Sequence, residues 1–379
     1  MQTAFVNGRV LLDGDFTSDR VVVIDGPRIA AITARDDVPA AARRIDLHGA
    51  LLLPGFIDVQ VNGGGGVLFN DAANIEDVRK LAAAHRAFGT TGLLPTLISD
   101  DLDVIAAALD LVARAIDANV PGILGIHVEG PFLSPARRGV HDASKFRELD
   151  EPAFRLLTSM QHGKLLLTLA PETTTPDMIR RLARAGVVIS AGHTNARYAD
   201  IRRAIDAGLR GFTHLFNAMS PLTGREPGTV GAALEDLHSW CGLIVDGHHV
   251  DPVTMKLALR CKPIDRFMLV TDAMPTVGMS GEYFMLQGRR ITVRDGMCLD
   301  ESGTLAGSNL DMACAVRNAV RMLDVDLATA VRMASEFPAA FLGLERHLGR
   351  IAVGARASFV IADEEMNIGA TWIDGQAAS

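Results

Sequence analysis

The 379-residue sequence lacks the long apolar run that a membrane span requires. Hydrophobic residues make up 48% of the chain, yet no segment reaches the roughly 18 uninterrupted apolar residues of a transmembrane helix. The N-terminal residues also lack the basic start and apolar stretch of a secretory signal, since Arg9 and Asp13 interrupt them early. These absences predict a protein that is not exported and has no membrane partner.

Cysteine pairs and basic clusters are missing as well. The four cysteines, Cys241, Cys261, Cys298 and Cys314, form no CxxC pair or regular framework, and a large apolar core needs no disulfides. A formal net charge of -8 comes without any basic run, which argues against a nucleic-acid partner. The composition favours a reducing cytoplasm and a small-molecule substrate.

The middle of the chain, residues 54–345, alternates short apolar runs with amphipathic helical patterns such as TPDMIRRLARAG and ARYADIRRAIDAG. This alternation is typical of βαβ units and predicts an α/β fold, a (β/α)8 TIM-like barrel. An insertion, GEYFMLQGRRITVRDGMCLD, predicts a β-hairpin after the eighth strand. The eight strands are expected at 56–61, 92–97, 123–128, 165–170, 187–191, 211–214, 242–245 and 267–271.

Both ends of the chain have a different sequence pattern. Residues 1–53 contain short β-rich runs separated by turn signals, and residues 346–379 resume this pattern. We therefore expect the two segments to form one small β-sandwich domain with antiparallel strands, beside a hydrolase barrel over 54–345.

Four polar residues, Glu129, His193, His214 and Asp272, each stand at or near the end of a predicted barrel strand. Polar groups from distant parts of a barrel converge at the carboxyl ends of its strands. One carboxylate and two imidazoles are a known ligand set for a catalytic metal, which predicts that Glu129, His193 and His214 bind one divalent ion. Zinc is favoured over iron, manganese and cobalt, although these ligands suit several metals.

A bound divalent cation acidifies its water towards a pKa of about 7 and polarises a carbonyl. Asp272 can then take the proton of the attacking water and return it to the leaving amine. Each residue has a simpler interpretation: a strand histidine more often packs in the core, Glu129 could cap a helix, and Asp272 could fix the turn before Pro275. The joint pattern of four strand ends favours the catalytic interpretation.

Several motifs of the chain resemble, in order, those of the N-acetylglucosamine-6-phosphate deacetylases of the amidohydrolase superfamily. They span nearly the whole chain and read PGFIDVQVNGGGG, HVEGPFLSP, LAPE, SAGHTNA, THLFNAMSP and LVTDAM. The resemblance implies deacetylation of N-acetyl-D-glucosamine 6-phosphate to D-glucosamine 6-phosphate and acetate. It also implies the metal ligands and the general base inferred above.

Further roles rest on this resemblance alone. His141 corresponds to a histidine that hydrogen-bonds the scissile carbonyl, and Asn217 and Ala218 correspond to positions that contact the substrate phosphate. Arg225 and His249 correspond to a phosphate-binding pair that reaches the neighbouring subunit's site in a homodimer. His248 precedes His249, but His249 keeps the family spacing from Asp246.

Gln60 and Asn62 stand where many amidohydrolases have the H-x-H pair of a second metal. Neutral amides are poor substitutes for imidazole as ligands of transition metals, so one metal per subunit is expected. The absence of the paired histidines also counts against a cyclic-amide hydrolase of the same superfamily. Two hypotheses stay open beside the main one: the same chemistry on an epimer such as N-acetylgalactosamine 6-phosphate, and a non-catalytic sugar-phosphate sensor.

Overall fold

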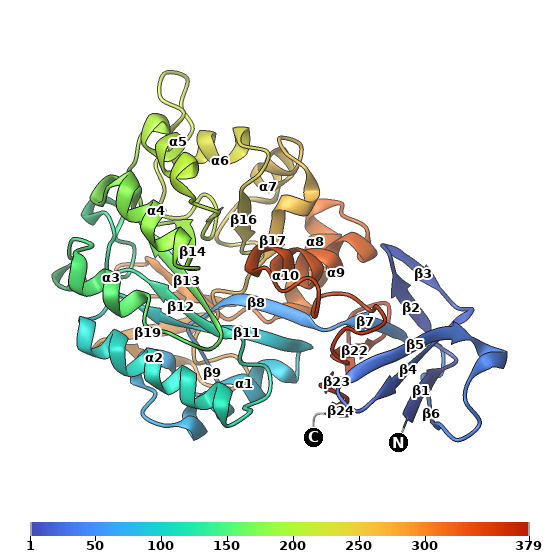
Figure 1. The fold of residues 1–379 in the computed structure, drawn as a ribbon. Coiled ribbons are helices and arrows are strands. Elements are labelled where there is room, and N and C mark those ends of the chain that lie inside the picture. The colour runs from blue at the N-terminus through green and yellow to red at the C-terminus, as the bar shows by residue number, and fades with distance from the viewer. Residues whose placement is uncertain (1, 378–379) are drawn as a thin grey trace.

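A computed structural model describes residues 2–377 and consists of a barrel and a smaller β module (Figure 1). Within this range, eight parallel strands follow one another around the barrel in chain order. A parallel bridge between Val61 and Ala273 joins the first strand to the segment after the last. The predicted (β/α)8 barrel is confirmed, and its strands are β8 (Phe56–Val61), β11 (Thr90–Ile98), β12 (Gly125–Glu129), β13 (Lys164–Leu169), β14 (Val188–Ala191), β15 (Gly211–Phe212), β16 (Trp240–Leu243) and β17 (Phe267–Leu269).

The helices surround this barrel (Figure 1), and their buried apolar residues belong to the same core cluster as those of the strands. Their ends follow local signals: Asn74 and Thr175 accept hydrogen bonds from the first turns of α1 and α4, and Gly208 ends α5 with a positive φ of 113°. The α-helices are α1 (Ile75–Arg86), α2 (Leu102–Asp117), α3 (Glu151–Leu157), α4 (Pro176–Arg184), α5 (Tyr198–Ala207), α6 (Gly228–Glu235), α7 (Pro252–Leu259), α8 (Met312–Leu323), α9 (Leu327–Ala334) and α10 (Glu336–Leu342).

Two small sheets lie at the end of the barrel. The predicted insertion hairpin is present and extends to an antiparallel sheet of four strands, β18 (Tyr283–Leu286), β19 (Arg289–Arg294), β20 (Met297–Leu299) and β21 (Leu305–Ser308). Its apolar side chains, including Leu286 and Ile291, pack against Ile98 and Val140. The glycine run forms the tight hairpin of β9 (Gly63–Gly64) and β10 (Val67–Leu68).

The smaller module contains segments from both ends of the chain, as predicted. One sheet holds β1 (Gln2–Val6), β4 (Arg20–Asp25), β5 (Arg28–Ala34) and β6 (Arg43–Asp46). The other holds β2 (Arg9–Leu12), β3 (Asp15–Thr17), β7 (Leu51–Pro54), β22 (Phe359–Ala362), β23 (Ile368–Ile373) and β24 (Gln376–Ala377). The ring of Phe5 lies 5.5 Å from that of Phe359 and 5.0 Å from that of Trp372, so the terminal segments share one core.

The strand directions in this module differ from the prediction of an antiparallel arrangement. β1 pairs in parallel with β6, and β2 pairs in parallel with β7. Both pairs are separated by long connections, which permit the crossover that a parallel pair requires, and this cannot be read from alternation alone. β7 pairs with β22 and so joins the N-terminal and C-terminal segments, while the domain boundaries at 53 and 346 stay a prediction.

No helix among residues 2–377 is both long enough and apolar enough to cross a membrane.

Candidate metal centre

The four predicted strand-end residues lie together at the carboxyl end of the barrel. Glu129 ends β12, while His193, His214 and Asp272 follow β14, β15 and β17 by two or three residues. All four are buried. His193, His214 and Asp272 have positive φ values of 48°, 35° and 53°, a backbone region that costs such residues about 1–3 kcal/mol each. The surrounding structure therefore holds the backbone of three of the four residues in a strained conformation.

The side chains of Glu129, His193 and His214 converge on one point. The Nε2 atom of His214 lies 3.0 Å from Oε1 of Glu129 and 3.1 Å from Nε2 of His193. The distance from Nε2 of His193 to Oε1 of Glu129 is 3.4 Å, and one ligand atom from each residue lies within 4.8 Å of the others. Such a set of one carboxylate and two imidazoles fits a divalent metal.

The orientation of His193 also fits metal binding. Its Nδ1 lies 3.0 Å from the carbonyl oxygen of Arg137. If Nδ1 donates its proton to this carbonyl, the lone pair of Nε2 is free for a metal, an arrangement that is usual for metal-bound histidines. The structure thus places the predicted ligands close together. The carbonyl of Arg137 favours the His193 tautomer that has a free lone pair on Nε2.

The charged forms of Glu129 and His214 stabilise each other. Burial alone would raise the pKa of Glu129, but its hydrogen bonds to His193 and His214 hold that pKa well below its usual value. Burial disfavours the charged form of His214, yet the hydrogen bond with Glu129 leaves the pKa of His214 raised. The carboxylate of Glu129 is therefore ionised and available as a ligand at neutral pH.

Asp272 lies beside this group in a different environment. Burial, followed by repulsion from Glu129, raises the pKa of Asp272 to about 6. Its Oδ1 accepts hydrogen bonds from Nε2 of Gln60 at 3.1 Å and from Nδ2 of Asn62 at 2.7 Å. The two carboxylates thus have pKa values shifted in opposite directions, as expected where one group binds a cation and the other exchanges a proton near neutral pH.

His141 is buried next to the centre, and its ring centroid is 4.3 Å from that of His193. Burial, reinforced by the neighbouring His193, holds the pKa of His141 well below its usual value, so the ring is neutral. Its Nδ1 lies 2.8 Å from the hydroxyl oxygen of Ser99, which leaves Nε2 as the nitrogen available to other partners.

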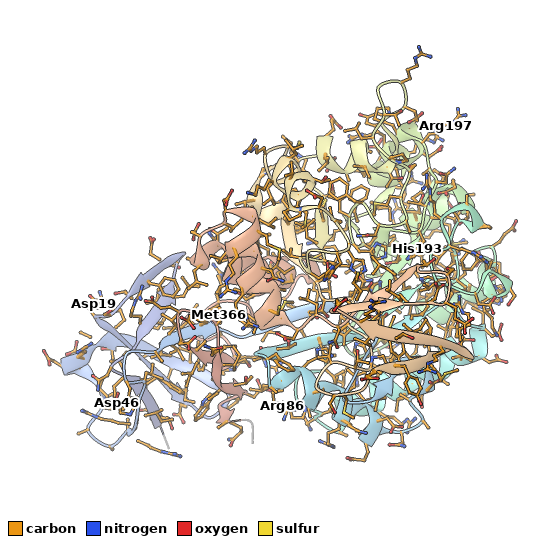
Figure 2. The ribbon with its side chains drawn as sticks, turned by 180° about the vertical axis from the view of Figure 1, so that it is seen from behind. Asp19, Asp46, Arg86, His193, Arg197 and Met366 are labelled. Carbon is orange, nitrogen blue, oxygen red and sulfur yellow. The ribbon has the colours of Figure 1, made fainter. Side chains whose placement is uncertain are left out.

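A cavity of about 430 Å³ opens over these residues. Its walls include Glu129, His141, His193, His214 and Asp272, together with the sequence-predicted Asn217, Ala218 and His249. Figure 2 shows His193 at the end of the barrel near the sheet β18–β21, and Leu305 of β21 lines the same cavity. The inserted sheet therefore contributes a wall of the site.

The two residues of the predicted phosphate pair lie in different places. Arg225 is exposed in the loop before α6 and is not among the residues that line the cavity. His249, by contrast, lines the cavity of its own chain, which differs from the expectation that it reaches outward to a neighbour. Its Nδ1 lies 2.6 Å from Oδ2 of Asp246, and this contact fixes the ring against the barrel end.

Some contacts of the site were not predicted. Ser99 immediately follows β11, and the rule that used strand ends could have identified it. The carbonyl of Arg137 could not be identified, because a backbone acceptor has no sequence signal. His127, two residues before Glu129 on β12, fills the barrel interior: it is fully buried and its Nε2 lies 2.7 Å from the hydroxyl oxygen of Thr168.

The fold and the three converging side chains define a barrel protein with a group that could hold a divalent metal at the carboxyl ends of its strands. The chain belongs to the amidohydrolase family, whose model matches residues 51–378.

Relatives and solved structures extend over nearly the whole chain. An N-acetylgalactosamine-6-phosphate deacetylase from Shewanella sp. (strain ANA-3) is 45% identical, over 97% of this chain and 94% of its own. An N-acetylglucosamine-6-phosphate deacetylase from Haemophilus influenzae is 32% identical, over 99% of each chain. The crystal structure of N-acetylglucosamine-6-phosphate deacetylase from Pasteurella multocida superposes with a TM-score of 0.97 at 34% identity and covers all of both chains.

Proposed function

We propose that this protein is a metal-dependent hydrolase that converts N-acetyl-D-glucosamine 6-phosphate to D-glucosamine 6-phosphate and acetate. The observation that carries the proposal is the convergence of Glu129, His193 and His214 beside Asp272 on the wall of one cavity. The names of the full-length relatives and of the superposed structure support the substrate class. The intact set of four residues argues against a non-catalytic sugar-phosphate sensor.

Glu129, His193 and His214 would hold one divalent metal per subunit. When bound, the metal supplies Lewis acidity, which polarises the acetamide carbonyl and makes water a better nucleophile at neutral pH. Zinc is the proposed ion, and metal analysis of the purified protein would distinguish it from iron, manganese and cobalt.

Asp272 exchanges the proton in this mechanism. With a pKa of about 6 it is mostly ionised at neutral pH, and it accepts a proton from the water that attacks the carbonyl carbon. The protonated carboxyl group then donates to the amide nitrogen as the C–N bond breaks, which releases the amino sugar and acetate.

His141 stabilises the negative charge that develops on the carbonyl oxygen. The Ser99 hydroxyl can donate its one hydrogen to Nδ1 of the neutral ring, at 2.8 Å, in place of the carbonyl of Glu129 at 3.3 Å, and the ring then carries its proton on Nε2. A donor of this kind that is fixed before the reaction stabilises an oxyanion without reorganisation.

The phosphate group would bind where Asn217 and Ala218 line the same cavity, and His249 adds an imidazole that Asp246 holds in place. Arg225 would complete the site of a neighbouring subunit, because its guanidinium group can donate two hydrogen bonds to one phosphate.

Four exposed apolar side chains support the homodimer that this role of Arg225 requires. Leu222, Leu237, Val253 and Leu257 are each more than half exposed, and they lie on α7 and on the segments that flank α6. Leu222 belongs to the same loop as Arg225. Burial of these side chains against a second copy would bring the Arg225 loop to the partner.

The proposed location is a reducing cytoplasm. All four cysteines are free thiols, and Cys241 and Cys298 are buried in the apolar core. Free thiols are typical of proteins that are not exposed to an oxidising compartment.

N-acetylgalactosamine 6-phosphate is a second candidate substrate, because the Shewanella relative with 45% identity is named for that activity. The two sugars differ only in the configuration at C4, which motifs for metal and phosphate binding do not distinguish. Initial rates of acetate release from both epimers, measured with the same metal-reconstituted protein, test the assignment. A higher kcat/KM for the glucosamine derivative is expected, and a preference of tenfold or more for the galactosamine derivative would overturn it.

A further inference from the structure

The side-chain amide of Gln60 bridges the two carboxylates of the site. Gln60 is 1% exposed on β8, and its Nε2 lies 3.2 Å from Oε1 of Glu129 and 3.1 Å from Oδ1 of Asp272. An amide NH2 group has two hydrogens, so each carboxylate can receive one of them. The donor capacity of this nitrogen is thereby fully used.

Asn62 provides a second donor to the same oxygen. It is 1% exposed, and its Nδ2 lies 2.7 Å from Oδ1 of Asp272. Residues two apart in a strand project from the same face, so Gln60 and Asn62 both reach the barrel interior near its rim. Two amide N–H groups, one from β8 and one from the residue that follows it, therefore converge on a single carboxylate oxygen.

The backbone below these side chains is tied together by Asp58. Its Oδ1 accepts hydrogen bonds from the backbone N–H of Gln60 at 3.1 Å and of Thr271 at 3.3 Å. Its Oδ2 accepts the hydroxyl of Thr271 at 2.5 Å, and the backbone N–H of Asp272 donates to the carbonyl of Gln60 at 3.0 Å. The segments that carry the amides and Asp272 are thus fixed relative to each other.

The two oxygens of Asp272 are consequently not equivalent. Oδ1 accepts two hydrogen bonds, whereas Oδ2 has no hydrogen bond to any residue within 2–377. An oxygen that already accepts two N–H donors is the weaker base, because each donor stabilises its negative charge. Since Asp272 lines the cavity, Oδ2 is the oxygen that remains available to water and substrate.

We propose that Gln60 and Asn62 form an amide clamp that engages Oδ1 of Asp272 and presents Oδ2 as the atom that accepts and returns the proton. Both are positioning residues, since they act through Asp272 and Glu129. The inference rests on the proposed deacetylation. It adds which oxygen atom of Asp272 exchanges the proton.

The clamp also explains how two carboxylates remain close together without a second cation between them. Each side of the Gln60 NH2 group offers a partial positive charge, which offsets repulsion between Glu129 and Asp272 without adding a net charge. The competing interpretation is that Gln60 merely fills space at the barrel end. These interpretations differ in what a side chain of the same size without N–H donors would do.

The test uses the metal-loaded full-length protein with Gln60→Met and Asn62→Leu, which retain side-chain volume and remove the donors. Asn318→Leu is the matched control, because Asn318 donates from a partly buried amide to the carbonyl of Val245 away from the cavity. Loss of hydrogen bonds to a charged group predicts that kcat, normalised to bound metal, falls on the order of 10- to 100-fold in each clamp variant, with KM changed less than about threefold. The control should retain kcat.

Crystal structures of the metal-loaded wild type and of Gln60→Met provide a readout that does not depend on turnover. We expect the Asp272 carboxylate to have one orientation in the wild type, with Oδ1 on the amides, and a rotated or multiple orientation in the variant. An unchanged orientation, or a kcat equal to that of the control, would overturn the clamp. If the wild type deacetylates no amino-sugar phosphate, the proposed function fails, while these crystal structures still decide whether the amides hold Asp272.

Discussion

Replacement of Asp272 by asparagine should preserve the shape of the site and remove its ability to transfer a proton. The amide oxygen of the introduced side chain would still accept the N–H groups of Gln60 and Asn62, which now meet Oδ1 at 3.1 and 2.7 Å. The other position, however, would carry an NH2 group that cannot take a proton from water. The variant should therefore fold and bind metal, yet lose catalysis.

General acid–base catalysis contributes roughly 10²- to 10⁴-fold, or about 3 to 5 kcal/mol of transition-state free energy, and kcat should fall by this factor. KM should change little, because Asp272 is not a proposed phosphate contact. Burial of this carboxylate opposes its ionisation and raises its pKa to about 6, so a neutral amide should not lower the stability of the fold at pH 7 to 8.

The assay is steady-state acetate release at saturating metal, with the thermal midpoint and the metal content of each variant measured alongside. Asp311→Asn is the control: Asp311 caps α8 by accepting from Cys314, and asparagine caps helices equally well. Retention of more than a tenth of kcat in Asp272→Asn would refute the assignment of Asp272 as the proton carrier.

Three further predictions concern other residues. Glu129→Gln should lower bound metal from one ion per subunit to nearly none by elemental analysis, and full occupancy would contradict the ligand assignment. Arg225→Ala should raise KM by about tenfold or more with kcat largely retained, since it removes a charged phosphate contact; an unchanged KM would exclude that contact. Burial lowers the pKa of His85 to about 4 against about 6.5 when unfolded, so between these values the unfolded state binds more protons and stability falls as the pH drops from 6.5 to 4. In His85→Gln, urea unfolding should show a shallower pH dependence over this range, by up to about 1.4 kcal/mol per pH unit, and an identical slope would contradict the reasoning.

The barrel could be predicted because its signals are local. Each predicted strand overlaps an observed one, and Glu129, His193, His214 and Asp272 were recognisable as polar groups at the ends of apolar runs. Their convergence could also be predicted, because a closed barrel brings the carboxyl ends of its strands together.

The remaining features depend on contacts between distant segments. The parallel pairing of β1 with β6 follows from a crossover and has no local signature. Gln60 could be identified from the sequence as a departure from the paired histidines, but its bridge between Glu129 and Asp272 requires three strands in register. The position of His249 in its own cavity likewise depends on the contact with Asp246 and not on spacing.

The decisive measurement is acetate release from N-acetylglucosamine 6-phosphate, with chelator-stripped protein and the unphosphorylated sugar as comparisons. We predict turnover that requires both a divalent metal and the 6-phosphate. Absence of acetate release with zinc, iron, manganese and cobalt alike, or equal rates on the unphosphorylated sugar, would contradict the proposed function.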